Sequence, residues 1–271
     1  MNVEPVVPGE GWGVLHLFFH VRRDIAADPH FEGTAAAIDF ATRVRAFDER
    51  EHCQVIAFSV LGHKADLGFM VLSPDLAALD AFSVELATAP LGQALVLAGS
   101  YLSLTELSEY TPDADDERRR LVEEEGLTEG SRELTEALEA FEQRMAAYAE
   151  HRLHPDLPTK RVLSFYPMSK RREGDDNWYL LDFDDRKRLM GGHARVGRSY
   201  RGRILQLITG SVGLDDWEWA VTLLADDPKA LRDIVYEMRF DEVSARYGEF
   251  GPFVTALIME PESLLRHHRL S

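Results

Sequence analysis

Two residues in the second half of the chain could take part in chemistry on a bound ligand. His193 follows Leu189 by four positions and Met190 by three, so helical spacing puts its imidazole on an apolar face. A neutral imidazole there either packs as a core side chain or ligates a metal ion. Tyr166 lies in a segment of period-two alternation, shortly before the basic run 170–172. It is either a core tyrosine or a phenol beside a cationic rim.

An amide interrupts an apolar strand face further along. Gln206 falls between Ile204 and Ile208, where an apolar residue is expected. A buried amide without partners costs about 1 to 3 kcal/mol. Gln206 therefore either bonds a neighbouring strand or water, or faces a ligand.

Glycines surround His193 in the predicted helix. Gly191 and Gly192 precede it and Gly197 follows it. Each weakens a helix by about 1 kcal/mol relative to alanine. In return, glycines permit the close approach of something flat and bulky.

The segment 236–251 is dense in charge and interleaved with apolar residues. Arg239 and Ser244 within it could bind carboxylates. The alternative is that Arg239 forms an ordinary ion-pair network with Asp241, Glu242 or Glu249. We find no P-loop, nucleophilic triad or dinucleotide fingerprint beside these residues.

Composition and charge limit the function classes. The chain has 271 residues, 45% of them apolar, which supports one large core or two modest ones. Its single cysteine, Cys53, excludes an internal disulfide and a Cys-rich metal site. The net charge of -17 would repel a phosphate backbone. Residues 160–203 nevertheless hold 12 basic and 6 acidic side chains, which favours a small anionic ligand over nucleic acid.

We expect a cytoplasmic protein that does not enter the membrane. No stretch reaches the roughly 18 apolar residues of a spanning helix. Residues 1–11 carry Glu4 and Glu10 where a signal peptide would carry lysines.

Alternating and helical spacings predict the same element order, βαββαβ, in both halves of the chain. In the first half, strands are expected over 12–23, 53–61, 68–72 and 100–108, and helices over 34–51 and 74–88. In the second half, strands are expected over 161–168, 203–209, 217–224 and 253–259, and helices over 183–200 and 228–247.

This order predicts an α+β fold, with two ferredoxin-like halves forming a dimeric α+β barrel within one chain and helices outside. We divide the chain into a first half (1–112), an acidic connecting helical segment (113–158) and a ligand-binding second half (159–271). Pro167 cannot donate to a ladder, so its strand is expected at a sheet edge or bulged near its end.

The connecting segment should contain one amphipathic helix that packs on the sheets. Ser131 is its predicted N-cap. One apolar stripe, with spacings of four, three, four and three, is formed by Leu134, Leu138, Phe141, Met145 and Tyr148.

The second half resembles the chlorite-dismutase-like haem family, and more narrowly its coproheme decarboxylase branch. The matching motifs occur in order between about residues 152 and 253. They are YPMSKRR (166–172), NWY (177–179), LMGGH (189–193), GRSYRGRILQLITGS (197–211), DDWEW (215–219) and YEMRFDEVSARYGEFG (236–251). The first half matches only in length and element order.

The resemblance implies a haem-biosynthesis enzyme. Hydrogen peroxide would drive the loss of carbon dioxide from two propionates of Fe-coproporphyrin III, giving haem b, with the substrate as its own redox cofactor. A homopentamer is implied, with transient contact to the coproporphyrin ferrochelatase. A haem-binding or sensing protein without turnover, and a chlorite dismutase, are the alternatives. Chlorite dismutases carry a distal arginine, so Gln206 disfavours the last of these and indicates the glutamine-bearing type of decarboxylase.

The resemblance also implies roles for single residues. His193 would ligate iron, Tyr166 would form a radical beside the reactive propionate, and Lys170 would exchange a proton nearby. The remaining implied contacts are Met168 at the porphyrin edge, Gln206 on the distal side, and Arg152, Arg239 and Ser244 at propionates. Contacts from the first half are not assigned, and Tyr101 is a weak candidate for one.

Overall fold

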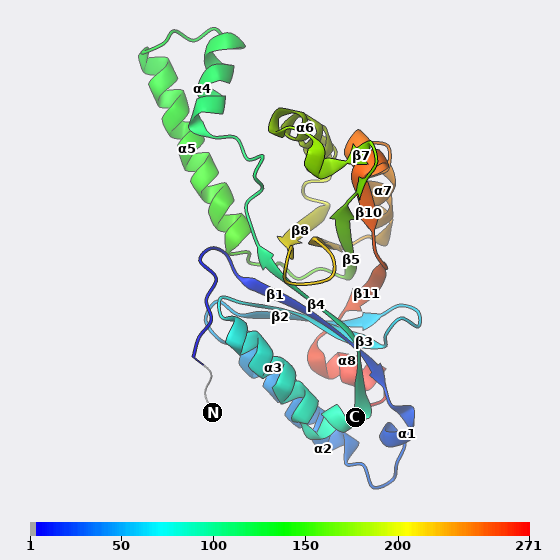
Figure 1. Cartoon of the computed structure of the whole chain (residues 1–271). Helices are drawn as coiled ribbons and strands as arrows, with labels where there is room; N and C mark the ends of the chain where they lie inside the picture. Colours follow the sequence, from blue (N-terminus) through cyan, green and yellow to red (C-terminus); the bar gives the residue numbers. More distant parts are fainter. Residues whose placement is uncertain (1–3) are drawn as a thin grey trace.

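The computed structural model describes residues 4–271 (Figure 1). The first half contains β1 (Gly13–Val21), α1 (Arg23–Ala26), α2 (Gly33–Asp48), β2 (Gln54–Val60), β3 (Leu67–Ser73), α3 (Leu76–Thr88) and β4 (Leu95–Thr105). The second half contains β5 (Val162–Lys170), α6 (Phe183–Ser199), β8 (Ile204–Gly210), β9 (Trp219–Ala225), α7 (Pro228–Met238) and β11 (Val254–Ile258). Short additions are β6 (Arg172–Glu173), β7 (Asp176–Asn177), β10 (Gly248–Phe250) and α8 (Pro261–His267).

The strands form one antiparallel sheet that closes into a barrel. The first half has the order β2-β3-β1-β4 and the second β11-β5-β9-β8. Strand β11 pairs with β2, and β4 pairs with β8, so each half is joined to the other along both edges. The predicted α+β fold with two ferredoxin-like halves is therefore confirmed.

Side-chain alternation along the strands creates an inner and an outer core. On β5, Leu163 and Phe165 point into the barrel and pack with first-half residues such as Phe58. On the same strand Tyr166 and Met168 belong to a separate cluster outside the barrel, under α6 and α7. The period-two prediction for this strand is thus correct.

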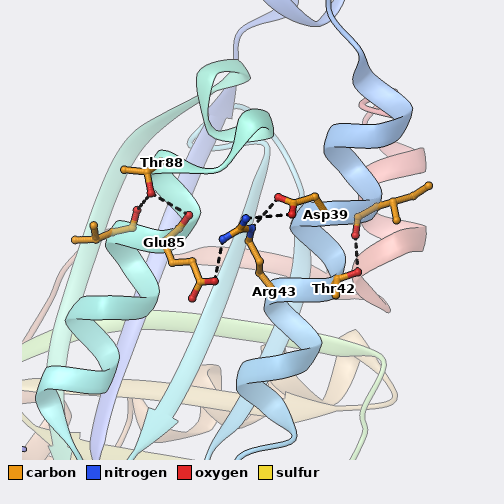
Figure 2. Close-up of polar contacts among 7 residues, drawn as sticks. Asp39, Thr42, Arg43, Glu85 and Thr88 are labelled. Carbon is orange, nitrogen blue, oxygen red and sulfur yellow. Dashed lines mark hydrogen bonds and ion pairs between the residues drawn. The ribbon is translucent and has the colours of Figure 1, made fainter. Parts of the chain in front are cut away.

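Helices α2 and α3 cover the outer face of the first half (Figure 1). Arg43 on α2 donates to Asp39 at 2.7 Å and to Glu85 of α3 at 3.0 Å (Figure 2). All three side chains are more than one-third exposed, so this link adds little stability and the apolar cluster beneath the helices holds them in place.

The connecting segment differs from the prediction. Instead of one helix packed on the sheets, α4 (Ala114–Glu123) and α5 (Arg132–Leu153) form a hairpin that projects from the barrel (Figure 1). Leu121 of α4 is buried together with Leu134 and Phe141 of α5. The helix that was not predicted, α4, therefore covers the apolar stripe of α5. Ser131 accepts a bond from the backbone N of Leu134, as predicted for the N-cap.

Two alternatives were open for the Pro167 strand, a sheet edge and a bulge near its end, and the edge is wrong. Strand β5 has partners on both sides, and on one side it pairs with β9 from Val162 to Met168 without a shift of register. On the other side its partner changes from β11 at Phe165 to β10 at Met168. Pro167, which has no N–H, occupies the break between these two partners, and its carbonyl accepts from Gly251 at 2.8 Å.

The helix predicted over 228–247 ends early. Helix α7 ends at Met238, and a π-helical turn follows over Val243–Tyr247. Asp241 accepts a bond from the backbone N of Ser244 at 3.0 Å, which starts this separate turn. Within residues 4–271, no helix has the length and apolar character needed to cross a bilayer.

Candidate functional site

The site is built on the outer face of β5, β9 and β8, beneath α6 and α7. The antiparallel register arranges this face in rows of aligned residues. Three of these rows are Met168, Trp219 and Gly210, then Tyr166, Val221 and Ile208, then Ser164, Leu223 and Gln206. Tyr166 and Gln206 therefore share one surface, two strands and one row apart, which is about 12 Å along the sheet.

Tyr166 presents a phenol without a hydrogen-bond partner among residues 4–271. Its ring is 5% exposed and stacks on Phe253 at 4.3 Å, with Phe250 at 6.0 Å. Burial raises the pKa of Tyr166 to about 12, against the opposing charge of Arg239. The side chain is thus a neutral phenol whose oxygen is free to meet a ligand.

Arg239 follows α7 and contacts Phe250, a ring that also lies beside Tyr166. Its guanidinium carbon is 4.7 Å from the centre of the Phe250 ring. Across residues 4–271 it forms no ion pair within 4 Å. The ion-pair network considered for Arg239 in the sequence is therefore wrong, and its fork of donors remains available to an anion.

His193 is oriented by a carboxylate. Its Nδ1 lies 3.0 Å from Oδ2 of Asp241, and its side chain is 28% exposed. Burial pushes the pKa of Asp241 upward, but the bonds from His193 and Ser244 outweigh it and leave that pKa below the usual value. Nε2 contacts no hydrogen-bonding group in the described chain. An imidazole held in this way by a second residue is typical of metal ligation.

Ser244 is not free in this structure. Its hydroxyl donates to Oδ2 of Asp241 at 3.1 Å, in addition to the backbone bond that starts the π-helical turn. The residue predicted as a propionate contact therefore supports the partner of His193.

Gln206 contacts helix α6 directly. Its Nε2 donates to the carbonyl of Gly197 at 2.9 Å, one turn beyond His193. A Cβ on Gly197 would lie 3.3 Å from Oε1 of Gln206 and 3.4 Å from Met238. Gly197 therefore makes room for these side chains, whereas a Cβ on Gly191 or Gly192 would meet no atom within 4 Å.

Lys170 ends β5 on the same face as Tyr166 and Met168. Four residues of extended chain separate its Cα from that of Tyr166 by about 13 Å. Burial lowers the pKa of Lys170 to about 8, although Asp241 and Glu218 favour the charged form. Its ammonium is 4.5 Å from the ring centre of Trp178.

Arg152 brings the end of α5 to this face. One terminal nitrogen donates to the carbonyl of Ile208 at 3.0 Å, and its buried Nε has no hydrogen-bond partner among residues 4–271. Glu106 lies nearby and accepts a bond from Nε1 of Trp219 at 3.0 Å; burial raises the pKa of its carboxyl. By contrast, Tyr101 points into the barrel, where its hydroxyl contacts Ser211, so the weak prediction for Tyr101 is wrong.

The residues present fit a haem-type group. Residues 4–271 contain no cluster of three or more His, Cys, Asp or Glu side chains that could hold a metal ion by themselves. A porphyrin needs a single axial imidazole, and the free Nε2 of His193 can supply it. The unpartnered Nε of Arg152 and the ammonium of Lys170 suit the carboxylates of such a ligand.

Comparison with known proteins gives the class. The family model described as chlorite dismutase matches residues 34–259. A structure described as a novel haem-binding protein from Thermus thermophilus is 35% identical, with a TM-score of 0.79 and 99% of each chain covered. A chlorite dismutase variant from Candidatus Nitrospira defluvii is 16% identical, with a TM-score of 0.72 and 97% of each chain covered, which shows the shared fold. The chain belongs to the chlorite dismutase family.

Sequence reasoning missed three supporting residues. Asp241 was considered only as a partner of Arg239, although its position three residues before Ser244 is the spacing of a capping side chain. Phe250 and Phe253 enclose Tyr166 from a chain segment more than 80 positions away, and no local pattern indicates that contact.

Proposed function

We propose that the protein is a coproheme decarboxylase, which uses hydrogen peroxide to remove carbon dioxide from two propionates of Fe-coproporphyrin III and so makes haem b. The observation that carries the proposal is the free, buried phenol of Tyr166 on the same sheet face as the neutral amide of Gln206. Coproheme has four carboxylates. Arg152, Lys170 and Arg239 provide cations around this face, which supports such a substrate.

Each residue has a defined task in this proposal. His193 would ligate iron through Nε2, with Asp241 keeping the ring in place through Nδ1. Gln206 would lie on the distal side, where a neutral amide cannot act as an acid or base. Tyr166 would give up its phenolic hydrogen atom and then take one from the adjacent propionate. The bound iron porphyrin supplies the oxidising power when it reacts with peroxide.

The reaction needs a proton donor. One propionate, one hydrogen peroxide and one proton give one vinyl group, one carbon dioxide and two waters. Because burial lowers the pKa of Lys170 to about 8, its ammonium can lose and regain a proton near neutral pH. We propose Lys170 as this donor, with Met168 at the porphyrin edge between it and Tyr166.

A haem-binding protein without turnover is the second candidate. It is favoured by the 35% identical structure, which is described as a haem-binding protein. It also requires only the His193–Asp241 pair, which is present here. A chlorite dismutase is disfavoured, since position 206 carries an amide in place of arginine.

Replacing Tyr166 by Phe tests the proposal. The variant keeps the ring that stacks on Phe253 and loses only the hydroxyl. We expect coproheme binding to change by less than about twofold and formation of haem b to fall on the order of 100-fold. The Tyr200→Phe variant is a matched control, because Tyr200 lies in the same cluster with its hydroxyl on Glu237. Equal product formation by wild type and Tyr166→Phe would refute the radical role.

The proposal extends to assembly and partners. We propose a homopentamer that receives coproheme from the ferrochelatase that makes it, within the cytoplasm. Light scattering on the purified chain measures the first point, and a monomer at micromolar concentration would contradict it.

A further inference from the structure

Lys170 is a buried residue whose ammonium has no ordinary partner among residues 4–271. Its residue is 7% exposed, and in residues 4–271 no oxygen lies within hydrogen-bond or ion-pair distance of its Nζ. The group in contact with it is the indole of Trp178, whose ring centre is 4.5 Å away. A charge removed from water needs compensation, and the negative face of an indole supplies part of it.

Trp178 is a fixed platform for this contact. Its side chain is 3% exposed and meets Tyr247 edge-on at 5.3 Å and Tyr110 at 6.4 Å. Its backbone N donates at 3.0 Å to the carbonyl of Arg171, the residue next to Lys170. The side chain of Asn177 caps the turn 178–180 through Tyr179. The indole of Trp178 is therefore held in place by packing and by a backbone hydrogen bond to the residue that follows Lys170.

Two carboxylates face Lys170 and both are already engaged. Glu218, before β9, accepts from the backbone N of Lys170 at 2.7 Å and lies 3.8 Å from Arg172. Asp241, after α7, accepts from Ser244 and contacts His193. Both raise the pKa of Lys170 from a distance, but neither forms a direct pair with it.

We propose that Trp178 is a positioning residue, which holds the Lys170 ammonium in the site by a cation–π contact. The use of Lys170 as a proton donor depends on the proposed function. The contact itself does not.

The test replaces Trp178 with mono-, di- and tetrafluorotryptophan by site-specific incorporation in the full chain. Fluorine weakens the negative ring face with little change of shape. The readout is the pH dependence of Lys170 acetylation by acetic anhydride, measured by mass spectrometry of its peptide without added porphyrin. The other lysines, Lys64, Lys160, Lys187 and Lys229, serve as internal references. Tetrafluorotryptophan at Trp12, which packs on His52 and His154, is the matched control.

We expect the titration midpoint of Lys170 to fall stepwise with fluorination, by about 0.5 to 1 pH unit in total, and to stay unchanged in the Trp12 control. Trp178→Phe should retain most of the wild-type midpoint, since it keeps an aromatic face. A titration midpoint of Lys170 that does not change with fluorination at position 178 would overturn the proposal. If the midpoint moves while wild type makes no haem b, the contact stands and the proposed function fails.

Discussion

At the scale of single residues, three polar groups of the site have no hydrogen-bond partner among residues 4–271. They are the phenol of Tyr166, the Nε of Arg152 and Nε2 of His193. Of the three, the Nε of Arg152 is fully buried. A buried donor without an acceptor is costly, so its retention indicates that a ligand completes it.

The Asp241 contact leads to a prediction on metal binding. Asp241→Ala removes the group that orients His193, and we expect affinity for iron porphyrin to fall about 10- to 100-fold. Titration followed by the porphyrin absorption band measures this. The Ser244→Ala variant is the control, because it removes a bond to Asp241 and leaves the imidazole contact intact. Equal losses in the two variants would show that the carboxylate has no special role at His193.

How far the sequence predicts these residues depends on the range of their contacts. Period-two and helical spacing place Tyr166 and Gln206 on the correct strand faces, because those patterns are local. The environment of Ser244 and the inward position of Tyr101 depend on the π-helical turn and on barrel closure, which involve distant segments. Spacing alone therefore predicts which strand face a residue lies on, but not which distant residues it contacts.

At the scale of elements, α6 contains two kinds of glycine. Gly197 is buried and gives space to Gln206 and Met238, whereas a Cβ on Gly192 would meet nothing within 4 Å. Only the first is explained by packing inside the chain. The second lies on open helix surface beside His193, which suits the approach of a flat ligand.

The two glycines should respond differently to alanine. Gly192→Ala gains helix propensity without a clash, so we expect the free energy of unfolding to rise by about 1 kcal/mol. Gly197→Ala gains the same propensity but pushes on its two neighbours, and the increase should be smaller or absent. Urea denaturation of the two variants without ligand measures the difference. An equal increase in the free energy of unfolding of both variants would mean that Gln206 and Met238 move away from the new Cβ at no energetic cost.

The ends of elements were less predictable than their order. The predicted helix over 228–247 continues an apolar spacing that α7 does not follow beyond Met238. Asp241 accepts a hydrogen bond from the backbone N of Ser244 and begins a new turn. Because α7 ends at Met238, Arg239 lies outside the helix and contacts Phe250. A side chain that competes for backbone bonds changes the path of the chain where periodicity predicts none.

At the scale of the whole molecule, closure of the barrel brings the two halves into one interior. His16 of β1 reaches across it, with Nε2 2.9 Å from the hydroxyl of Thr222 on β9. The imidazole is fully buried, its Nδ1 has no hydrogen-bond partner in the described part of the chain, and its ring centre lies 4.4 Å from that of Phe165. Burial lowers the pKa of His16 to about 3, from 6.5 in the unfolded chain.

This buried imidazole predicts a pH dependence of stability. Between pH 6.5 and about 3 the unfolded chain binds a proton at His16 that the folded chain does not, so wild type loses stability as the pH falls. Relative to His16→Phe, the loss should be about 1.4 kcal/mol for each pH unit in this range. Urea denaturation of both proteins at pH 7 and pH 4.5 measures it. A difference between them that is the same at both pH values would contradict the assignment.

The proposed function is, at this scale, a reaction of the whole chain with Fe-coproporphyrin III. The most direct measurement mixes the full chain with Fe-coproporphyrin III, adds hydrogen peroxide in steps, and follows the mass of the porphyrin and the carbon dioxide released. We predict two molecules of carbon dioxide for each porphyrin and a final product with the mass of haem b, at one peroxide per carboxylate lost. A porphyrin that binds through His193 and keeps all four carboxylates after peroxide would contradict the account.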